Sequence, residues 1–182
     1  MLASARAARA VTFAGMDAFL AIVSRREARA YDGTPISDDA KRRILEAGRL
    51  AGSSRNRQQR RFVVLNDREA ISQVVWSPEN VLGAALVVAI VVSGKGPLGL
   101  DAGRAAQNML LAAHNEGIGS CPNGVSDAGA AAALIGAGEE EQVATILSFG
   151  HPSRPAHPER RSADEWIERA DRRPFGEIVS ER

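Results

Sequence analysis

The sequence predicts a single domain that combines helices with strands, and three observations support this. The chain has 182 residues, of which 45% are hydrophobic and 25% charged, which suits one folded domain with a substantial core. The run 85–92 is continuously apolar and rich in valine, as expected for a strand covered on both faces. Other segments repeat apolar residues at helical spacing, so both kinds of element are needed.

In the first half of the chain, turn and capping residues separate the predicted elements. Ser37 is suited to cap a helix because Asp38 and Asp39 follow it in the first turn. "FVVLN" has the composition of a short buried strand. The expected order is a helix over 16–24, a turn at 31–35, a helix from Ser37 to about Gly52, a strand over 62–66 and a helix over 67–75.

The second half contains the longest predicted helix. Asp101 is placed as its N-cap, the helix runs to about Glu116, and Gly117 supplies the left-handed residue after it. The alanines along one face of this helix would allow another helix to approach closely. The remaining expected elements are a strand over 85–92, a short helix over 126–136, a strand over 144–150 and an extended surface tail at 151–161.

Gly94, Gly96 and Gly99 have the G-x-G-x-x-G spacing of a dinucleotide-binding loop. Such a loop requires an acid at the end of the next strand, about 20 residues on, to bind the ribose. The acid at that distance, Glu116, falls in the last turn of the predicted helix, and Gly99 is expected to lie outside that helix. The spacing therefore favours an ordinary strand-to-helix loop over a Rossmann phosphate loop.

Three segments are candidates for binding an anionic cofactor. "SRREARAY" groups Arg25, Arg26 and Arg29, which either bind a phosphate or form a solvated basic turn. "AGSSRNRQQRRF" offers amide and hydroxyl groups that suit a heterocycle or simply cap a loop, and it has no interleaved aromatic residue for stacking RNA bases. "GIGSCPNG" either lets backbone approach a flat ligand or forms a structural turn. The polar residues of the second segment are Ser53, Ser54, Asn56 and Gln58, and those at the centre of the third are Gly119, Ser120, Cys121 and Pro122.

Composition excludes several other classes of function. The net charge of +1 gives no overall field for nucleic acid or an anionic membrane, and the run 81–92 is too short to span a bilayer. The single cysteine, Cys121, forms no internal disulfide and suits a reducing cytoplasm, and the three histidines lack zinc spacing. Residues 1–15 carry two arginines and no acid, which leaves open a targeting peptide, but we expect a disordered extension or an upstream start before Met16.

Taken in order, the motifs resemble those of the nitroreductase family of FMN-dependent oxidoreductases. "RREAR" is similar to the family's R-R-S-x-R, and "GSSRNRQQRRF" to its P-S-x-x-N-x-Q-P-W-x-F. "DAGRAAQNMLLAAHNEGIGS", "FGHP" and "RRPFGEIV" match three later family motifs. The resemblance covers about 16–179, and it departs from the pattern at Glu27, Gly52, Gln59 and Arg60.

The resemblance implies an α+β fold for a single FMN-binding domain over 16–182. This is a three-layer α/β/α sandwich whose central sheet is mostly antiparallel, assembled as an intertwined homodimer. Arg25, Arg26 and Arg172 would bind the FMN phosphate and ribityl chain, with Arg29 nearby and Glu27 paired with an arginine or turned away. The polar residues Ser53, Ser54, Asn56 and Gln58 would approach the flavin from the partner subunit. Gly119, Ser120, Cys121 and Pro122 would line the isoalloxazine edge near N5.

The implied activity is hydride transfer from NADH or NADPH through flavin N5 to a nitroaromatic, quinone or similar small acceptor, in a ping-pong cycle. No side chain is assigned as a catalytic acid or base, and no metal is expected, because the hydride chemistry belongs to the cofactor. The alternatives are a flavin-binding or regulatory protein without turnover, and a flavin-dependent dehydrogenase or dehalogenase of the same family. We expect a cytoplasmic homodimer that binds neither nucleic acid nor membrane.

Overall fold

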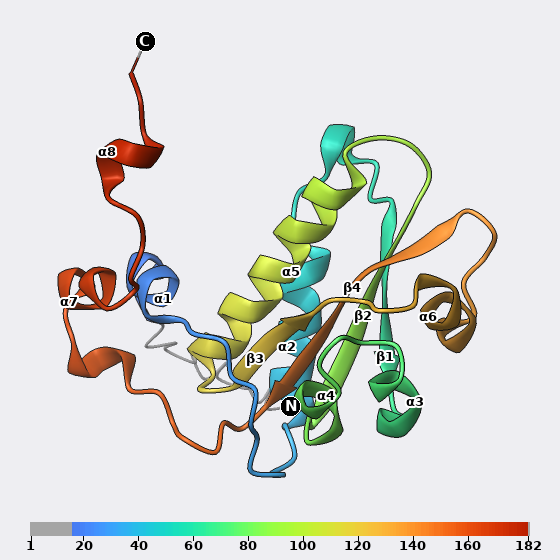
Figure 1. Ribbon diagram of the computed structural model, residues 1–182, viewed down its shortest axis with the longest axis horizontal. Coiled ribbons are helices and arrows are strands. Elements are labelled where there is room, and N and C mark those ends of the chain that lie inside the picture. The colour runs from blue at the N-terminus through green and yellow to red at the C-terminus, as the bar shows by residue number, and fades with distance from the viewer. Residues whose placement is uncertain (1–15, 182) are drawn as a thin grey trace, which may run out of the picture.

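The computed structural model describes residues 16–181, which form a sheet with helices on both faces and a C-terminal arm that leads away from it (Figure 1). Ser37 caps the second helix as predicted, through its side chain and the Ala40 backbone N–H. In chain order the elements are α1 (Ala18–Ser24), α2 (Asp38–Arg49), the 3₁₀ turn η1 (Ser54–Asn56), β1 (Arg60–Leu65), α3 (Arg68–Ser72), α4 (Glu79–Leu82), β2 (Leu86–Ser93), α5 (Leu98–Asn115), β3 (Gly119–Asn123), α6 (Ala128–Ile135), β4 (Glu141–Gly150), the 3₁₀ turn η2 (Pro158–Arg160), α7 (Ala163–Glu168) and α8 (Phe175–Ile178).

The sheet has four strands in the order β1-β2-β4-β3, and every neighbouring pair is antiparallel. At its centre Val88 lies opposite Val64 on one side and Leu147 on the other. The predicted combination of helices with a mostly antiparallel sheet is therefore confirmed. β2 and β4 hold the middle of the sheet, which explains why they are the longest apolar strands.

The apolar run of β2 is buried because its side chains alternate between two cores. Leu86, Val88 and Ile90 pack with α2 and α5, where Ile44 and Met109 are fully buried. The intervening residues of β2 face the opposite side and pack with α3, α4 and α6. The prediction of a strand covered on both faces is thus confirmed, and the fold has three layers (Figure 1).

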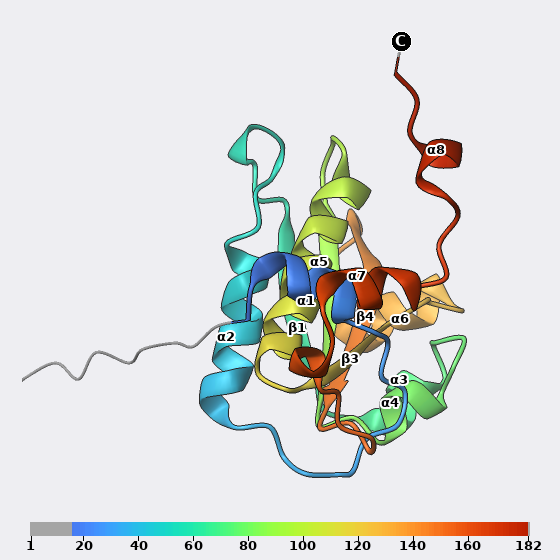
Figure 2. The same ribbon diagram turned by 90° about the vertical axis from the view of Figure 1, so that its left-hand side faces the viewer.

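After β4, the chain runs back to α1 through η2 and α7. In Figure 2, α7 lies beside α1, and these two helices contact each other. α8 then leads away from the body in both views (Figures 1 and 2). Its apolar side chains are uncovered, with Phe175 76% and Ile178 55% exposed. Neither α7 nor α8 was expected from the sequence.

The strand order excludes a Rossmann unit, but one of the sequence-based arguments against it was wrong. After β2 and α5 the chain enters β3, but β4 lies between β2 and β3 and runs antiparallel to both. A dinucleotide-binding βαβ unit needs parallel strands joined by its helix in a continuous parallel sheet. The expectation that Gly99 lies outside the helix was wrong, because α5 begins at Leu98.

Two further expectations need correction. Asp101 does not cap α5, which begins three residues earlier after Pro97; its carboxylate instead accepts hydrogen bonds from the Ser54 N–H. "GIGSCPNG" is not a turn, since β3 runs through it and pairs with β4. Strand pairing with β4 overrides the local glycine and proline signals there.

The remaining differences are of extent. β4 starts at Glu141, before the predicted strand, and α4 was not predicted. Gly117 follows α5 with φ +70°, as expected for the residue after a helix. The expectation for residues 1–15 lies outside the described residues, and within 16–181 no helix is both long and apolar enough to cross a membrane.

Candidate functional site

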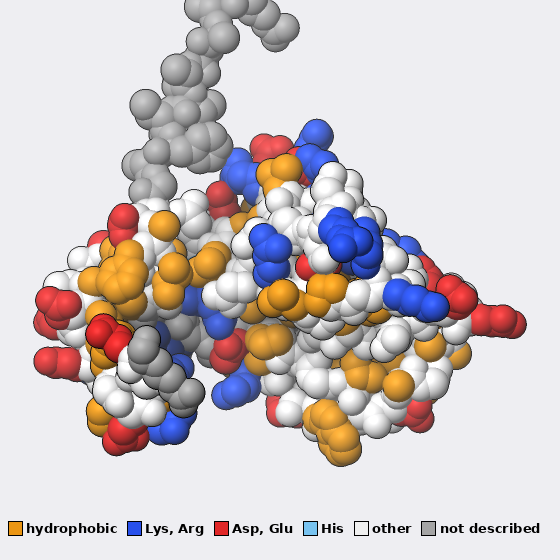
Figure 3. Space-filling model, turned by 90° about the horizontal axis from the view of Figure 1, so that it is seen from above, with side chains coloured by type: hydrophobic (Ala, Val, Ile, Leu, Met, Phe, Trp, Pro, Cys, Tyr) orange, Lys and Arg blue, Asp and Glu red, His pale blue; other side chains and the backbone are white. Residues whose placement is uncertain are grey.

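A cavity of about 790 Å³ lies where the C-terminal ends of α1 and α5 meet β3 and the segment from Pro152 to Trp166. Its volume is in the range of small-molecule and cofactor sites. Viewed from above, a recess separates the lobe that carries α7 and α8 from the rest of the molecule, and Lys and Arg side chains line it (Figure 3). Four predicted residues of the basic segment line the cavity, namely Arg25, Arg26, Glu27 and Arg29, together with Gly119 and Ser120 of β3.

Local structure brings the basic segment against β3. Asp17 caps α1 by accepting hydrogen bonds from two backbone N–H groups, and the helix ends at Ser24. Arg25 adopts an extended conformation, which directs the following residues along the outer edge of β3. There the Ala28 N–H donates to the Ser120 carbonyl at 3.0 Å. Two segments about 90 residues apart in the sequence therefore form adjacent walls of one cavity.

Arg25 lines the cavity, is largely buried and forms an ion pair. Its Nη2 lies 2.8 Å from Glu27 Oε1, and its side chain is 13% exposed. The other terminal nitrogen, Nη1, is buried and has no hydrogen-bond partner among residues 16–181. The motif that this segment resembles has serine where this chain has Glu27. We expected Glu27 either to pair with an arginine or to turn away, and it pairs with Arg25. A buried guanidinium nitrogen without a partner is costly unless an additional acceptor satisfies it.

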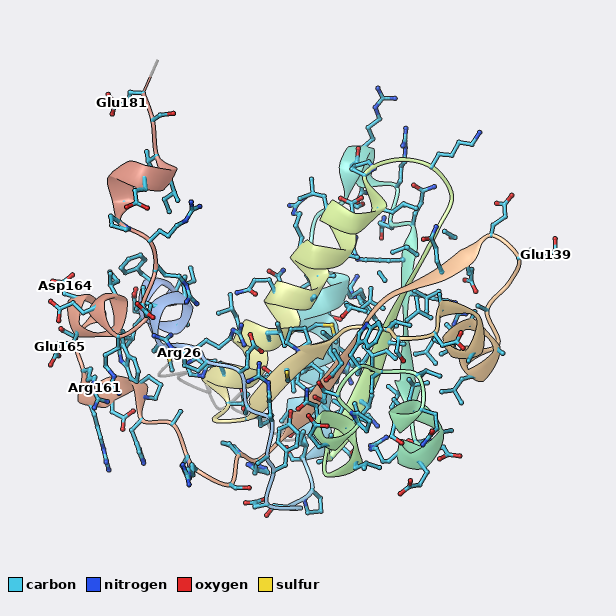
Figure 4. All side chains as sticks on the ribbon, viewed as in Figure 1. Arg26, Glu139, Arg161, Asp164, Glu165 and Glu181 are labelled. Atoms are coloured by element: carbon cyan, nitrogen blue, oxygen red, sulfur yellow. The ribbon has the colours of Figure 1, made fainter. Side chains whose placement is uncertain are left out.

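Arg26 links α1 to α7. Its Nη1 donates to the Val23 and Arg25 carbonyls at 2.7 and 2.9 Å, and its Nη2 donates to the Trp166 carbonyl at 3.2 Å. The guanidinium also lies over the Trp166 ring, 5.5 Å from its centroid, and Arg161 lies 5.1 Å from the same centroid. Figure 4 shows Arg26 on the side of α1 that faces this lobe, and Arg161 close by. Trp166 thus holds two cations at the cavity wall.

Arg172 lies on the same side of the molecule as Arg26. The pKa of Arg26 is lowered by partial burial and then by the positive charges of Arg172, Arg169 and Arg25. Arg172 is exposed and donates to the Ala170 carbonyl at 2.6 Å. Arg26 and Arg172 are 146 residues apart in sequence, yet the charge of Arg172 acts on Arg26. The two ends of the predicted phosphate site therefore form one region of positive charge. Bringing an anion there would reduce the repulsion.

β3 contributes backbone and a buried thiol. A Cβ at Gly119 would lie 2.5 Å from Ala28 Cβ, so only glycine fits between the strand and the basic segment. Cys121 is buried below the cavity, and burial raises the pKa of its thiol, followed by the negative charge of Glu27. A thiol with a raised pKa is poorly suited to act as a nucleophile. Pro122, by contrast, is exposed.

The polar residues Ser53, Ser54, Asn56 and Gln58 lie elsewhere in the chain. They form the loop around η1, which the Ser54 N–H fixes to Asp101 in the first turn of α5. His114, in the last turn of α5, lines the cavity. Thirteen residues of helix between Asp101 and His114 span about 20 Å. A single chain therefore divides the predicted site residues between the two ends of α5.

Several cavity residues were not singled out from the sequence. Ser24 and His114 are buried and lie 2.9 Å apart between Oγ and Nε2, and the pKa of His114 is lowered by burial and by Arg25 and Arg26. Arg154 comes from the tail 151–161 that was expected to be an extended surface segment, and Trp166 comes from α7, which follows it and was not predicted. Ser162 and Glu165 form a capping box, and this pair of residues was the sequence signal that could have predicted the start of α7. No group of three His, Cys, Asp or Glu residues within 16–181 is arranged to hold a metal ion.

Comparison with known proteins gives one consistent family. The family model described as "Nitroreductase family" matches residues 22–92 and 99–151. A protein of Archaeoglobus fulgidus named as an NADH dehydrogenase/NAD(P)H nitroreductase is 33% identical over 144 residues, which are 72% of this chain and 83% of the relative.

Solved structures agree with this result. A nitroreductase from Desulfovibrio desulfuricans in complex with FMN is 29% identical, with a TM-score of 0.75 over 92% of this chain and 98% of the other. A nitroreductase family protein from Clostridium difficile has a TM-score of 0.76 at 21% identity, over 91% of this chain and 98% of the other, and shows the same fold.

Proposed function

The chain belongs to the nitroreductase family, and on that premise we propose that it is an FMN-dependent oxidoreductase that passes a hydride from NADH or NADPH to a nitroaromatic, quinone or similar small acceptor. The observation that carries the proposal is that Arg25, Arg26 and Arg29 line one cavity of about 790 Å³, with Arg172 close enough for its charge to lower the pKa of Arg26. The FMN complex of the Desulfovibrio structure and the name of the Archaeoglobus relative support the cofactor and the hydride donor.

The residues present fit the phosphate end of FMN. Arg25 has a buried nitrogen that lacks an acceptor, and a phosphate oxygen would supply one. Burial, followed by the positive charge of Arg172, lowers the pKa of Arg26, and a dianionic ester between these two residues would offset the repulsion. Guanidinium groups bind such esters in a bidentate manner. We therefore assign Arg25, Arg26 and Arg172 to the phosphate and ribityl region, with Arg29 beside them.

The ring end would lie along β3. Gly119 leaves room for close approach of the backbone, and Ser120, Cys121 and Pro122 continue along the same strand. When bound, FMN supplies the hydride chemistry by accepting a hydride at N5 and releasing it to the acceptor in a ping-pong cycle. The chain's own task is to bind and orient the cofactor, and Cys121 stays protonated because its pKa is raised.

A homodimer would complete this site. Ser53, Ser54, Asn56 and Gln58 lie at the far end of α5, about 20 Å from the cavity of the same chain, so they can reach a flavin only in another copy. The uncovered apolar side chains Phe175, Ile178 and Val179 of the C-terminal arm support a second chain that covers them. We propose an intertwined dimer with two sites, each of which takes its phosphate-binding arginines from one chain and its polar loop from the other.

Absorption spectroscopy tests the proposal directly. The purified protein should be yellow or become so with added FMN, and anaerobic NADH or NADPH should bleach the flavin band at about 450 nm within seconds. A nitroaromatic or a quinone should then restore the colour. Protein that is colourless after incubation with excess FMN and removal of the free FMN would refute the proposal.

One observation favours a second candidate function. Glu27 takes up part of the charge of Arg25, which weakens the field available to a phosphate. A flavin-binding or regulatory protein without turnover would tolerate this better than an enzyme that must retain its cofactor. The anaerobic experiment separates the two: bound flavin that neither nicotinamide bleaches would favour the binding protein.

A further inference from the structure

Three cations meet at the end of the molecule opposite the cavity. Arg55 and Arg57 belong to the loop around η1, and Lys95 belongs to the turn between β2 and α5. All three are exposed, and Arg57 Nη1 donates to the Lys95 carbonyl at 3.0 Å, which joins the two loops. The loops lie side by side at the upper end in Figures 1 and 2, and Figure 3, which looks onto this end, shows Lys and Arg side chains gathered there.

These positive charges are not neutralised by neighbouring acids. None of the ion pairs formed between residues 16–181 involves Arg55, Arg57 or Lys95. Asp101, an acid that contacts the same loop, is buried and accepts from the Ser54 N–H. In a chain whose net charge is only +1, this basic end is a local feature that suits a local anion.

The loop that carries Arg55 and Arg57 is held in a costly conformation. Arg55, Asn56 and Gln58 have φ values of +52°, +55° and +54°, a region that residues other than glycine seldom occupy. Hydrogen bonds fix it, including those from the Gln58 N–H to Ser53 Oγ at 2.9 Å and from the Ser54 N–H to Asp101. Strain of this kind persists where the surrounding structure enforces it, commonly at ligand-binding sites.

The loop alternates neutral and charged side chains over a very short distance. Arg55 and Arg57 each lie between residues that we propose to contact the flavin, and consecutive Cα atoms are about 3.8 Å apart. If Asn56 and Gln58 contact a flavin, Arg55 and Arg57 are therefore one residue away from those contacts along the chain. A hydride donor must place its nicotinamide ring on that flavin, and its phosphates, a few bonds away, would then come within reach of these arginines.

We propose that Arg55, Arg57 and Lys95 bind the phosphate groups of the nicotinamide dinucleotide while its ring lies on the flavin. This inference rests on the proposed function and extends it by assigning residues to the hydride donor. Guanidinium forks match phosphate oxygens, and two arginines with a lysine are enough for a diphosphate and an additional ribose phosphate. RNA also carries phosphates, but neither loop offers an aromatic residue on which a base could stack.

The test compares donors that differ in charge. In the FMN-loaded Arg55→Ala/Arg57→Ala variant, the KM for NADPH should rise about tenfold or more, as expected for the loss of charge-assisted hydrogen bonds. The KM for N-benzyl-1,4-dihydronicotinamide, which has no phosphate, should not change. Calorimetric titration with NADP⁺ should give a matching loss of affinity without any turnover. The control is Lys41→Ala/Arg42→Ala, which also removes two positive charges, but from α2 near its N-terminus.

The outcomes separate this inference from the function it rests on. If the variant binds and reduces FMN normally and its KM for NADPH is unchanged, the assignment of these residues is wrong and the oxidoreductase proposal stands. An equal loss with the neutral donor would also overturn the assignment, because the loop would then act on the flavin. Lower affinity for a single-stranded oligonucleotide with unchanged NADP⁺ affinity would identify RNA as the ligand and overturn it as well. Wild-type protein that takes up no FMN would remove both proposals.

Discussion

The two ends of α5 present contrasting parts of one proposed site. At the C-terminal end, a single chain already forms a cavity, and Arg25 has a buried nitrogen with no acceptor among residues 16–181. At the N-terminal end, a strained loop is fixed by Asp101, but its side chains from Arg55 to Gln58 are exposed. Because this loop is rigid and its polar side chains are exposed, it suits a ligand that is bound mainly by another chain. The difference shows why one chain can explain only half of the site.

The largest expected effect is at the enclosed end. Arg25→Ala should weaken FMN binding by about tenfold to a hundredfold, because a charge-assisted contact to the phosphate is lost. Titration of the apoprotein by flavin fluorescence measures this. Arg61→Ala is the matched control, since Arg61 is also ion-paired, with Glu141 at 2.7 Å, but lies on β1. If both variants bind FMN as the wild type does, Arg25 is not a phosphate ligand.

Mixed dimers would show whether the two ends belong to different chains. Asn56→Gly/Gln58→Gly removes both loop amides at positions whose positive φ glycine accepts. This variant and Arg25→Ala should each bind FMN poorly alone. Co-refolded in equal amounts, they should recover roughly a quarter of the sites, because half of random dimers are mixed and each mixed dimer has one intact site. No recovery in verified mixed dimers would mean that both ends serve the same chain's flavin.

Much of the sheet was predictable because burial on both faces leaves a strong pattern. The continuous valine-rich run fixed β2, and Gly117 marked the end of α5. The start of α5 was missed because Asp101 has the chemistry of an N-cap, and nothing in the sequence reveals that its carboxylate binds the Ser54 N–H instead. β3 was not predicted as a strand, because pairing with β4 is a long-range effect that local glycines and proline conceal.

The site was predictable in its residue types but not in its assembly. The arginines and amides were identified from motifs, and these assignments of role remain predictions. The separation of Ser53–Gln58 from Arg25 by the length of α5 depends on tertiary structure that no spacing encodes. Trp166 and His114 were not identified because a lone aromatic or histidine in a helix looks the same as a core residue.

Asp101→Ala should affect the loop end alone. The buried carboxylate accepts from the Ser54 N–H at 3.0 and 3.2 Å, and its removal leaves that donor unsatisfied. We expect the free energy of unfolding to fall by about 1–3 kcal/mol. Amide hydrogen exchange should accelerate in residues 53–59 and not around Ala28 and Ser120. Asp101→Asn, which keeps one acceptor, should lose less, and uniform acceleration at both ends would contradict a local role.

Trp166→Leu should weaken the cavity end more mildly. The ring lies under Arg26 and Arg161, and loss of these cation–π contacts costs about 0.5–1 kcal/mol at an exposed site, which corresponds to a two- to fivefold loss of FMN affinity. Trp166→Phe should retain most of the affinity. Flavin should also quench the emission of Trp166, measured in a Trp76→Phe background. Unchanged affinity in Trp166→Leu would show that backbone carbonyls, including that of residue 166, position Arg26 without the indole ring.

The smallest effect is a pH dependence confined to the cavity end. Burial, Arg25 and Arg26 lower the pKa of His114 below its ordinary value of 6.5. Between the lowered pKa and 6.5 the unfolded chain binds more protons than the folded one, so this residue makes stability fall as the pH falls below about 6.5. Other groups titrate in acid too, so the informative quantity is the difference in unfolding midpoint between wild type and His114→Gln at pH 5.5 and 7.5. The wild type should lose more on acidification, because glutamine can still bond Ser24 Oγ but has no proton to gain. Bound FMN should reduce this difference, because a phosphate beside Arg25 offsets the positive charge that disfavours the imidazolium of His114. An equal loss of stability in wild type and His114→Gln would contradict the lowered pKa of His114.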